Sequence, residues 1–135
     1  MKSDIEIKDD VFAHIMESGL MGHLTGSLEK NGKRPQGSTK EDVVISVEGV
    51  DETRSVQRAY VAVNIYVSDT PRSEGDYVEN SQRIREICNL AKDALAVGGI
   101  GKDFTFHLEK QRVLTEENTR EHRIWNRLYY QVTTD

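Results

Sequence analysis

The stretch Arg54–Val67, RSVQRAYVAVNIYV, carries the strongest secondary-structure signal of the chain. From position 59 onward, one side of an extended chain is entirely aliphatic: Ala59, Val61, Val63, Ile65 and Val67. The other side is mostly aromatic or polar: Tyr60, Ala62, Asn64 and Tyr66. Such alternation of β-branched and aromatic residues predicts a half-buried strand. We expect this strand in the middle of a sheet, with its aliphatic side against a helix.

The rest of the chain contains both strand and helix patterns. Residues 79–97 predict the best helix, and a shorter one is expected over residues 9–18. The long helix carries a continuous apolar stripe made of Ile84, Ile87, Cys88, Ala91, Ala94 and Leu95. Gly98-Gly99 is typical of a helix C-terminal cap. Further strands are predicted over residues 23–30, 43–47, 103–109 and 122–133, joined by polar connectors over residues 31–41, 49–54, 68–76 and 115–121.

This order of elements predicts one α+β domain spanning residues 1–135. We expect a mostly antiparallel sheet of four to five strands, because short connectors join consecutive strands. A long helix and a short N-terminal helix should pack on one face of that sheet. Burial of the long helix's apolar stripe would then be a large local contribution to stability.

Composition limits the function classes. The chain of 135 residues has a net charge of −5, which argues against broad coating of nucleic acid. Cys88 is the single cysteine, so no intrachain disulfide or thiolate metal cluster is expected, and a reducing compartment is the default. We expect no signal peptide and no membrane span, because no apolar run approaches the roughly 20 residues required.

No catalytic, cofactor or metal site is predicted. The four histidines (His14, His23, His107 and His122) lack the paired spacing of metal ligands. Cys88 falls on the apolar stripe, where a thiol is inert. The sequence Gly98–Lys102 resembles a phosphate loop but follows a predicted helix, whereas such loops follow strands. Acidic residues concentrate in polar connectors, where their pKa values would stay ordinary.

Two surface features remain as candidate contact sites. The outer side of the sheet should carry a set of residues of the types enriched at interface centres: Tyr60, Tyr66, Trp125, Arg127 and Tyr129. The alternative is an ordinary outer face covered by the chain's own N-terminal residues. The second feature is a basic loop containing Lys30, Lys33, Arg34 and Lys40. Either it is solvated charge, or it meets nucleic acid or an acidic partner.

The sequence LTGSLEKNGKRPQGSTKEDVVIS, residues 24–46, resembles the early part of small tailed-phage and prophage morphogenesis proteins. The family is that of tail-terminator, tail-completion or head-tail joining proteins. The Arg34-Pro35 loop and the order of the later elements are similar to that family's layout.

The resemblance implies a structural subunit without active-site residues or cofactors. It implies a ring, often a hexamer, that caps the tail tube and joins it to the head, in the cytoplasm of a bacterial host and then in the virion. The loop at residues 30–40 would face the channel or a neighbour, and the Trp125 face would pack against other subunits. Tail-tube and head-completion proteins are the implied partners, with DNA contact only through the basic loop.

Two other function classes stay open. A small-molecule-binding domain or enzyme would need convergent polar groups at one end of the sheet, for which the candidates are Asn64, His107, His122 and Asn126. A dimeric regulator could instead use the basic loop on DNA.

Overall fold

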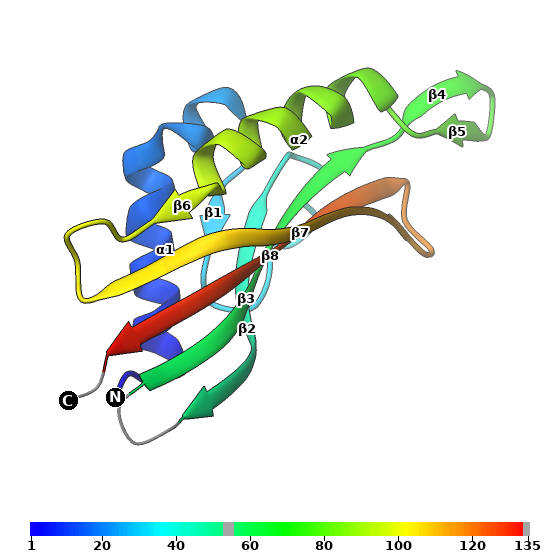
Figure 1. Cartoon of the computed structure of the whole chain (residues 1–135). Helices are drawn as coiled ribbons and strands as arrows, with labels where there is room; N and C mark the ends of the chain where they lie inside the picture. Colours follow the sequence, from blue (N-terminus) through cyan, green and yellow to red (C-terminus); the bar gives the residue numbers. More distant parts are fainter. Residues whose placement is uncertain (53–55, 134–135) are drawn as a thin grey trace.

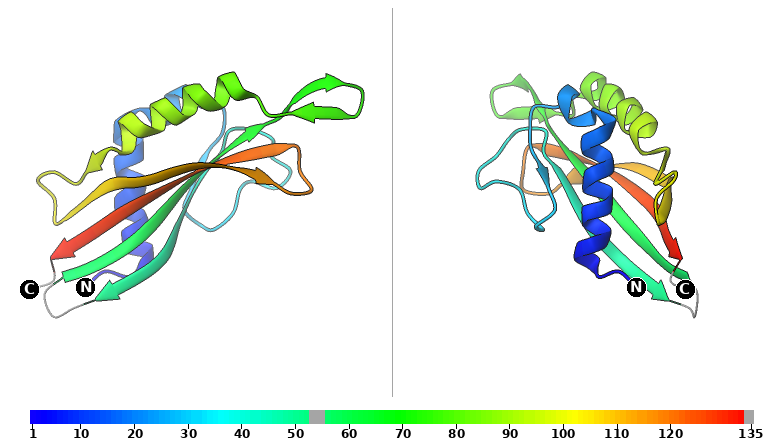
Figure 2. Two further views of the ribbon diagram at one scale, coloured as in Figure 1. Left: turned by 45° about the vertical axis from the view of Figure 1, so that its right-hand side comes forward. Right: turned by 90° about the vertical axis from the view of Figure 1, so that its left-hand side faces the viewer.

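The computed structural model describes residues 1–52 and 56–133 (Figure 1). In chain order the elements are α1 (Asp4–Ser18), the 3-10 helix η1 (Leu20–His23), β1 (Leu28–Glu29), β2 (Val43–Glu52), β3 (Val56–Ser68), β4 (Thr70–Ser73), β5 (Asp76–Val78), α2 (Ser81–Leu95), β6 (Val97–Gly98), β7 (Phe104–Glu116) and β8 (Glu121–Thr133). Six strands form a curled sheet in the order β1-β2-β3-β8-β7-β6. β4 and β5 form a separate two-stranded hairpin that projects beyond the start of α2 (Figures 1 and 2).

β3 is the central strand, as its alternation predicts. It pairs antiparallel with β2 on one side and with β8 on the other. Its aliphatic residues from Ala59 to Val67 are all buried in the core. Arg54 and Ser55, the first residues of the predicted stretch, lie outside the described residues.

The two helices cover the aliphatic side of the sheet. α1 begins at Asp4 because Ser3 and Glu6 form a capping box, in which the Ser3 hydroxyl accepts from the Glu6 N–H at 3.2 Å. The Glu6 carboxylate accepts in turn from the Ser3 N–H at 3.0 Å. α1 buries Ile7, Val11 and Ile15, and α2 buries the predicted stripe through Ile84, Ile87, Ala91 and Leu95.

The predicted fold class is wrong in its sheet and in its helices. The sheet has six strands and is mixed, because β1 pairs parallel with β2. The helices are equally long, at 15 residues each, so there is no long and short pair. β1 and β6 have two residues each, too few to produce a periodic pattern in the sequence. The capping box extends α1 five residues upstream of its expected start.

Several predicted segment boundaries are also wrong. β2 continues from Val47 to Glu52 because a bulge between Val47 and Gly49 lets pairing resume. The predicted connector at 49–54 is therefore strand up to Glu52, and its last two residues lie outside the described chain. The connector at 68–76 contains β4, and the strand at 23–30 shrinks to β1. Gly98 lies in β6, and the residue that ends α2 is Ala96.

Candidate interaction surface

The side of the sheet opposite the helices, here called the open face, carries the predicted aromatic and basic residues. At its centre the Tyr60 and Tyr129 rings meet edge to face, with centroids 5.6 Å apart. The Arg127 guanidinium carbon lies 3.7 Å from the Tyr60 ring centroid. The His107 ring stacks on the other side of Tyr129, at 5.6 Å. Strand register explains the cluster, because Tyr60 pairs with Tyr129 and Tyr129 with His107.

Trp125 extends this cluster along β8. It lies opposite Asn64 on β3 and Arg112 on β7, and its side chain is partly exposed. Next to it, Arg123 donates to the Glu116 carboxylate at 2.6 Å and to the Asn64 amide oxygen at 2.9 Å. The register therefore places all five predicted interface residues on the open face, and Tyr60 contacts both Tyr129 and Arg127.

Arg127 has unused hydrogen-bonding capacity. Its Nε is buried and has no hydrogen-bond partner among the described residues, although the Glu109 carboxylate lies 3.5 Å away. A buried N–H without an acceptor costs free energy, and the nearby Glu109 carboxylate offsets part of that cost by charge.

The four cations of the basic loop point to different parts of the protein. Lys30 turns to α1, where its ammonium contacts the Asp9 carboxylate at 2.7 Å and lies over the Phe12 ring. Lys33 and Lys40 are exposed. The four cations thus do not form one basic patch.

Arg34 points inward. Its guanidinium binds the carboxylates of Asp42 (2.9 Å) and Glu121 (2.8 Å) and lies 4.2 Å from the Tyr66 ring centroid. The Arg34 guanidinium therefore covers the Tyr66 ring, while the register keeps Tyr66 on the open face, opposite Arg123 and diagonal to Trp125. Sequence reasoning missed this anchor because Glu121 is 87 residues away along the chain.

Asp42 is the centre of the loop's attachment and is only 1% exposed. Besides Arg34, its carboxylate accepts from the Ser27 N–H at 2.9 Å and from the Ser38 hydroxyl at 2.6 Å. Burial alone would raise the pKa of Asp42, but these donors outweigh burial and hold that pKa below its ordinary value. The end of the loop is thus fixed to the start of β2.

Glu41 makes a second attachment, from the loop to α2. Arg83 donates from Nε and Nη2 to the two Glu41 oxygens, both at 2.7 Å. This bidentate pair is the main reason that the pKa of Glu41 lies below its ordinary value, and it raises the pKa of Arg83.

The depressed pKa values of Asp42 and Glu41 predict acid lability. Their stabilisation is fully present above the ordinary carboxyl pKa of about 4 and is lost as the pH falls through the lower folded-state values. In urea unfolding at pH 7, 5, 4 and 3, we expect the free energy of unfolding to decline below about pH 5. The Glu41→Gln variant should have a lower free energy of unfolding than the wild type at pH 7, and that free energy should decline less as the pH falls. Parallel curves for the two proteins would contradict this assignment.

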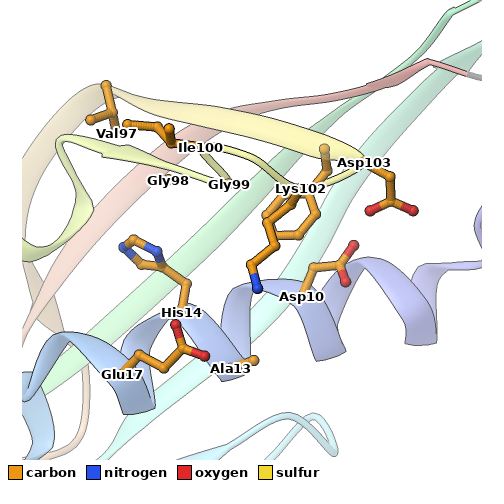
Figure 3. Close-up of a pocket in the computed structure, with 11 residues that line it drawn as sticks. Asp10, Ala13, His14, Glu17, Val97, Gly98, Gly99, Ile100, Lys102 and Asp103 are labelled. Atoms are coloured by element: carbon orange, nitrogen blue, oxygen red, sulfur yellow. The ribbon is translucent and has the colours of Figure 1, made fainter.

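A pocket of about 370 Å³ lies between α1 and the β6–β7 connection (Figure 3). Two of its polar side chains, Asp10 and His14, have structural partners. The Asp10 carboxylate accepts from the Lys2 ammonium at 2.6 Å and from the Tyr130 hydroxyl at 2.5 Å, while His14 Nε2 lies 2.7 Å from the Ala94 carbonyl oxygen. Burial, together with Asp10, raises the pKa of Tyr130. These contacts join α1 to the sheet and to the end of α2.

The polar residues predicted for a small-molecule site do not converge. Asn64 and His107 lie on the open face, whereas Asn126 is fully buried beneath the helices. Its amide donates to the Val63 carbonyl at 3.0 Å and accepts from Gln111, which also donates to the Cys88 carbonyl of α2. His122 pairs with Asp69 at 2.6 Å near the β4–β5 hairpin.

The remaining sequence candidates have these surroundings. Cys88 packs against the core, and burial raises the pKa of its thiol. Among residues 1–52 and 56–133, no group of three or more His, Cys, Asp or Glu side chains is placed to hold a metal ion. Within the same ranges, no helix has the length and apolar character to cross a membrane.

Neither a family model nor a curated protein sequence matches this chain. Its fold is similar to that of a solved chain from the virion of a native gene transfer agent particle, with a TM-score of 0.59. The similarity covers 94% of each chain at 12% sequence identity. The two chains therefore share a fold over nearly their whole lengths.

Proposed function

We propose that this protein is a structural subunit of a phage-like particle and acts by contact, without catalysis. The supporting observation is the fold shared over 94% of both chains with a component of a gene transfer agent virion. The resemblance of residues 24–46 to tail-terminator and head-tail joining proteins supports the finer proposal. In that proposal copies form a ring, often a hexamer, that caps the tail tube, first in the host cytoplasm and then in the particle.

The open face is the proposed contact surface for a tail-tube or head-completion protein. Tyr60, Trp125, Arg127 and Tyr129 combine the aromatic and guanidinium groups that contribute most to binding energy at interface centres. Tyr66, the fifth predicted residue, would support the loop from below Arg34. Any DNA contact by the loop would fall to Lys33 and Lys40, which are exposed.

Assembly tests the function. In light scattering at high concentration, the purified chain should have a mass several times that of its monomer, and it should co-sediment with tail tubes. A strictly monomeric chain that does not bind tail tubes would refute the proposal.

Trp125→Ala tests the contact surface. We expect it to weaken binding to tail tubes at least about tenfold, because truncation of a hot-spot tryptophan costs about 2 kcal/mol or more and about 1.4 kcal/mol corresponds to a factor of ten. Tyr77→Ala is the matched control, since Tyr77 is an exposed aromatic residue on the β4–β5 hairpin, away from the open face. Circular dichroism melting would confirm that both variants fold. Equal binding by the two variants would remove the open face from the proposal.

A further inference from the structure

The six-strand sheet has two free edges. β1 covers β2 only at Val43 and Val44, and β6 covers β7 only at Phe106 and His107. Among the described residues, no strand pairs with the outer side of Gly49–Glu52 on β2 or of Gln111–Leu114 on β7. Each of these stretches has backbone N–H and C=O groups available for another strand.

The two free edges carry opposite charge. The end of β2 has three exposed acidic residues, Glu48, Asp51 and Glu52, and no basic residue. β7 has two exposed basic residues, Lys110 and Arg112. Its own acidic residues are drawn toward β8, where Glu109 pairs with Arg127 and Glu116 with Arg123. Each edge therefore complements the other in sign.

Each free edge also exposes one valine, Val50 at 39% and Val113 at 38%. Val50 lies opposite Ala59 and Val113 opposite Ile124, so both are on the side of the sheet that the helices cover. Asp51, opposite Arg58, and Arg112, opposite Trp125, are both on the open face. An antiparallel pair with Val50 against Val113 therefore places Asp51 against Arg112. A shift of one residue would put these partners on opposite faces.

We propose that copies of this chain join edge to edge, with Gly49–Glu52 of one copy pairing antiparallel with Gln111–Leu114 of the next. The inference rests on the assembly of copies in the proposed function and identifies the joining surface. Because the pairing uses two different edges, it is heterologous and generates a ring when the rotation closes. Pairing of two β2 edges would bring acidic residues together, and like charges opposite one another are destabilising.

Charge reversal tests the pairing in the full-length protein. We expect Asp51→Arg alone and Arg112→Asp alone each to weaken self-association at least tenfold in light scattering. The double variant, which restores an opposite pair with its signs exchanged, should recover the wild-type mass. Melting temperatures would show that each variant folds. Unchanged assembly by both single variants would overturn the edge pairing.

Cross-linking provides a second readout and tests the register. In a Cys88→Ser background, we would mix the Val50→Cys and Val113→Cys proteins with oxidised glutathione. A disulfide-linked dimer in the mixture supports the pairing, because opposed residues in adjacent strands have Cβ atoms close enough for a disulfide. The control mixes Val50→Cys with Leu114→Cys, which faces the other side of the sheet and keeps Arg112, and should give little product.

The outcomes separate the two proposals. An oligomeric wild type without the expected cross-link, and insensitive to charge reversal, overturns the edge pairing and leaves the structural role intact. A wild type that is strictly monomeric, with neither cross-linking nor tail-tube binding, overturns both.

Discussion

Asp42→Ala is expected to lower the free energy of unfolding by about 3–5 kcal/mol, because removing one partner of a buried ion pair leaves other buried groups without a counterpart. The Asp42 carboxylate is almost fully buried and receives four hydrogen bonds from three residues, Arg34, Ser27 and Ser38. Without it, Glu121 remains as the charged partner of the Arg34 guanidinium among the described residues. Urea unfolding at pH 7 measures the loss.

Asp9→Ala is the matched control for Asp42→Ala. Asp9 also binds a cation of the basic loop, since its carboxylate contacts Lys30 at 2.7 Å. That pair is solvent-exposed, and exposed ion pairs contribute about 0–1 kcal/mol. Equal losses in the two variants would contradict the role of Asp42 as the central attachment of the loop.

Gly99→Ala is expected to cost about 2–5 kcal/mol, since it combines a left-handed backbone with a steric clash. Gly99 has a φ of 80°, and an added Cβ would lie 2.1 Å from the Phe104 carbonyl oxygen. Backbone atoms of β7 would have to move to make room. We expect a correspondingly lower midpoint in urea unfolding, without a change in slope.

Gly101→Ala separates the two contributions. Gly101 also has a φ of 80°, but no atom lies within 4 Å of its added Cβ. The Gly101→Ala variant should therefore lose only the free energy that an alanine pays in the left-handed region, about 1–2 kcal/mol. If both alanine variants lose the same amount, the contact between Gly99 and the Phe104 carbonyl does not restrict the connection between β6 and β7.

The fold could be predicted where the hydrophobic pattern is long. The alternation of β3 and the apolar stripe of α2 are both confirmed by burial. β6 could not be predicted, because two residues give no period, and the strand expected over residues 23–30 contains β1 but is longer than it. The start of α1 was available in the sequence, since Ser3 and Glu6 have capping-box spacing. The expected start at residue 9 rested on the apolar stripe and on the acidic residues that precede it, whereas the capping box lies further upstream.

The candidate surface was predicted in part. Alternation along β3 and β8 places all five predicted residues on one face, and the strand register brings Tyr60 into contact with Tyr129 and Arg127. Their role in binding stays a prediction. Arg34 was expected in an exposed basic loop, but the fold brings Asp42 and Glu121 to it. Local sequence could not reveal such a distant partner.

The positions of β1 and β6 have a consequence for the geometry of assembly. β1 pairs with the first residues of β2, and β6 pairs with residues near the start of β7. Because β2 and β7 run in opposite directions, these two starts lie at opposite ends of the sheet. Successive copies joined through the unshielded halves must therefore be displaced along the strands. Only if the strands are inclined to the central axis can such a displacement cancel around a closed circle. If the strands were parallel to the central axis, the same contacts would produce an open helical filament instead of a ring.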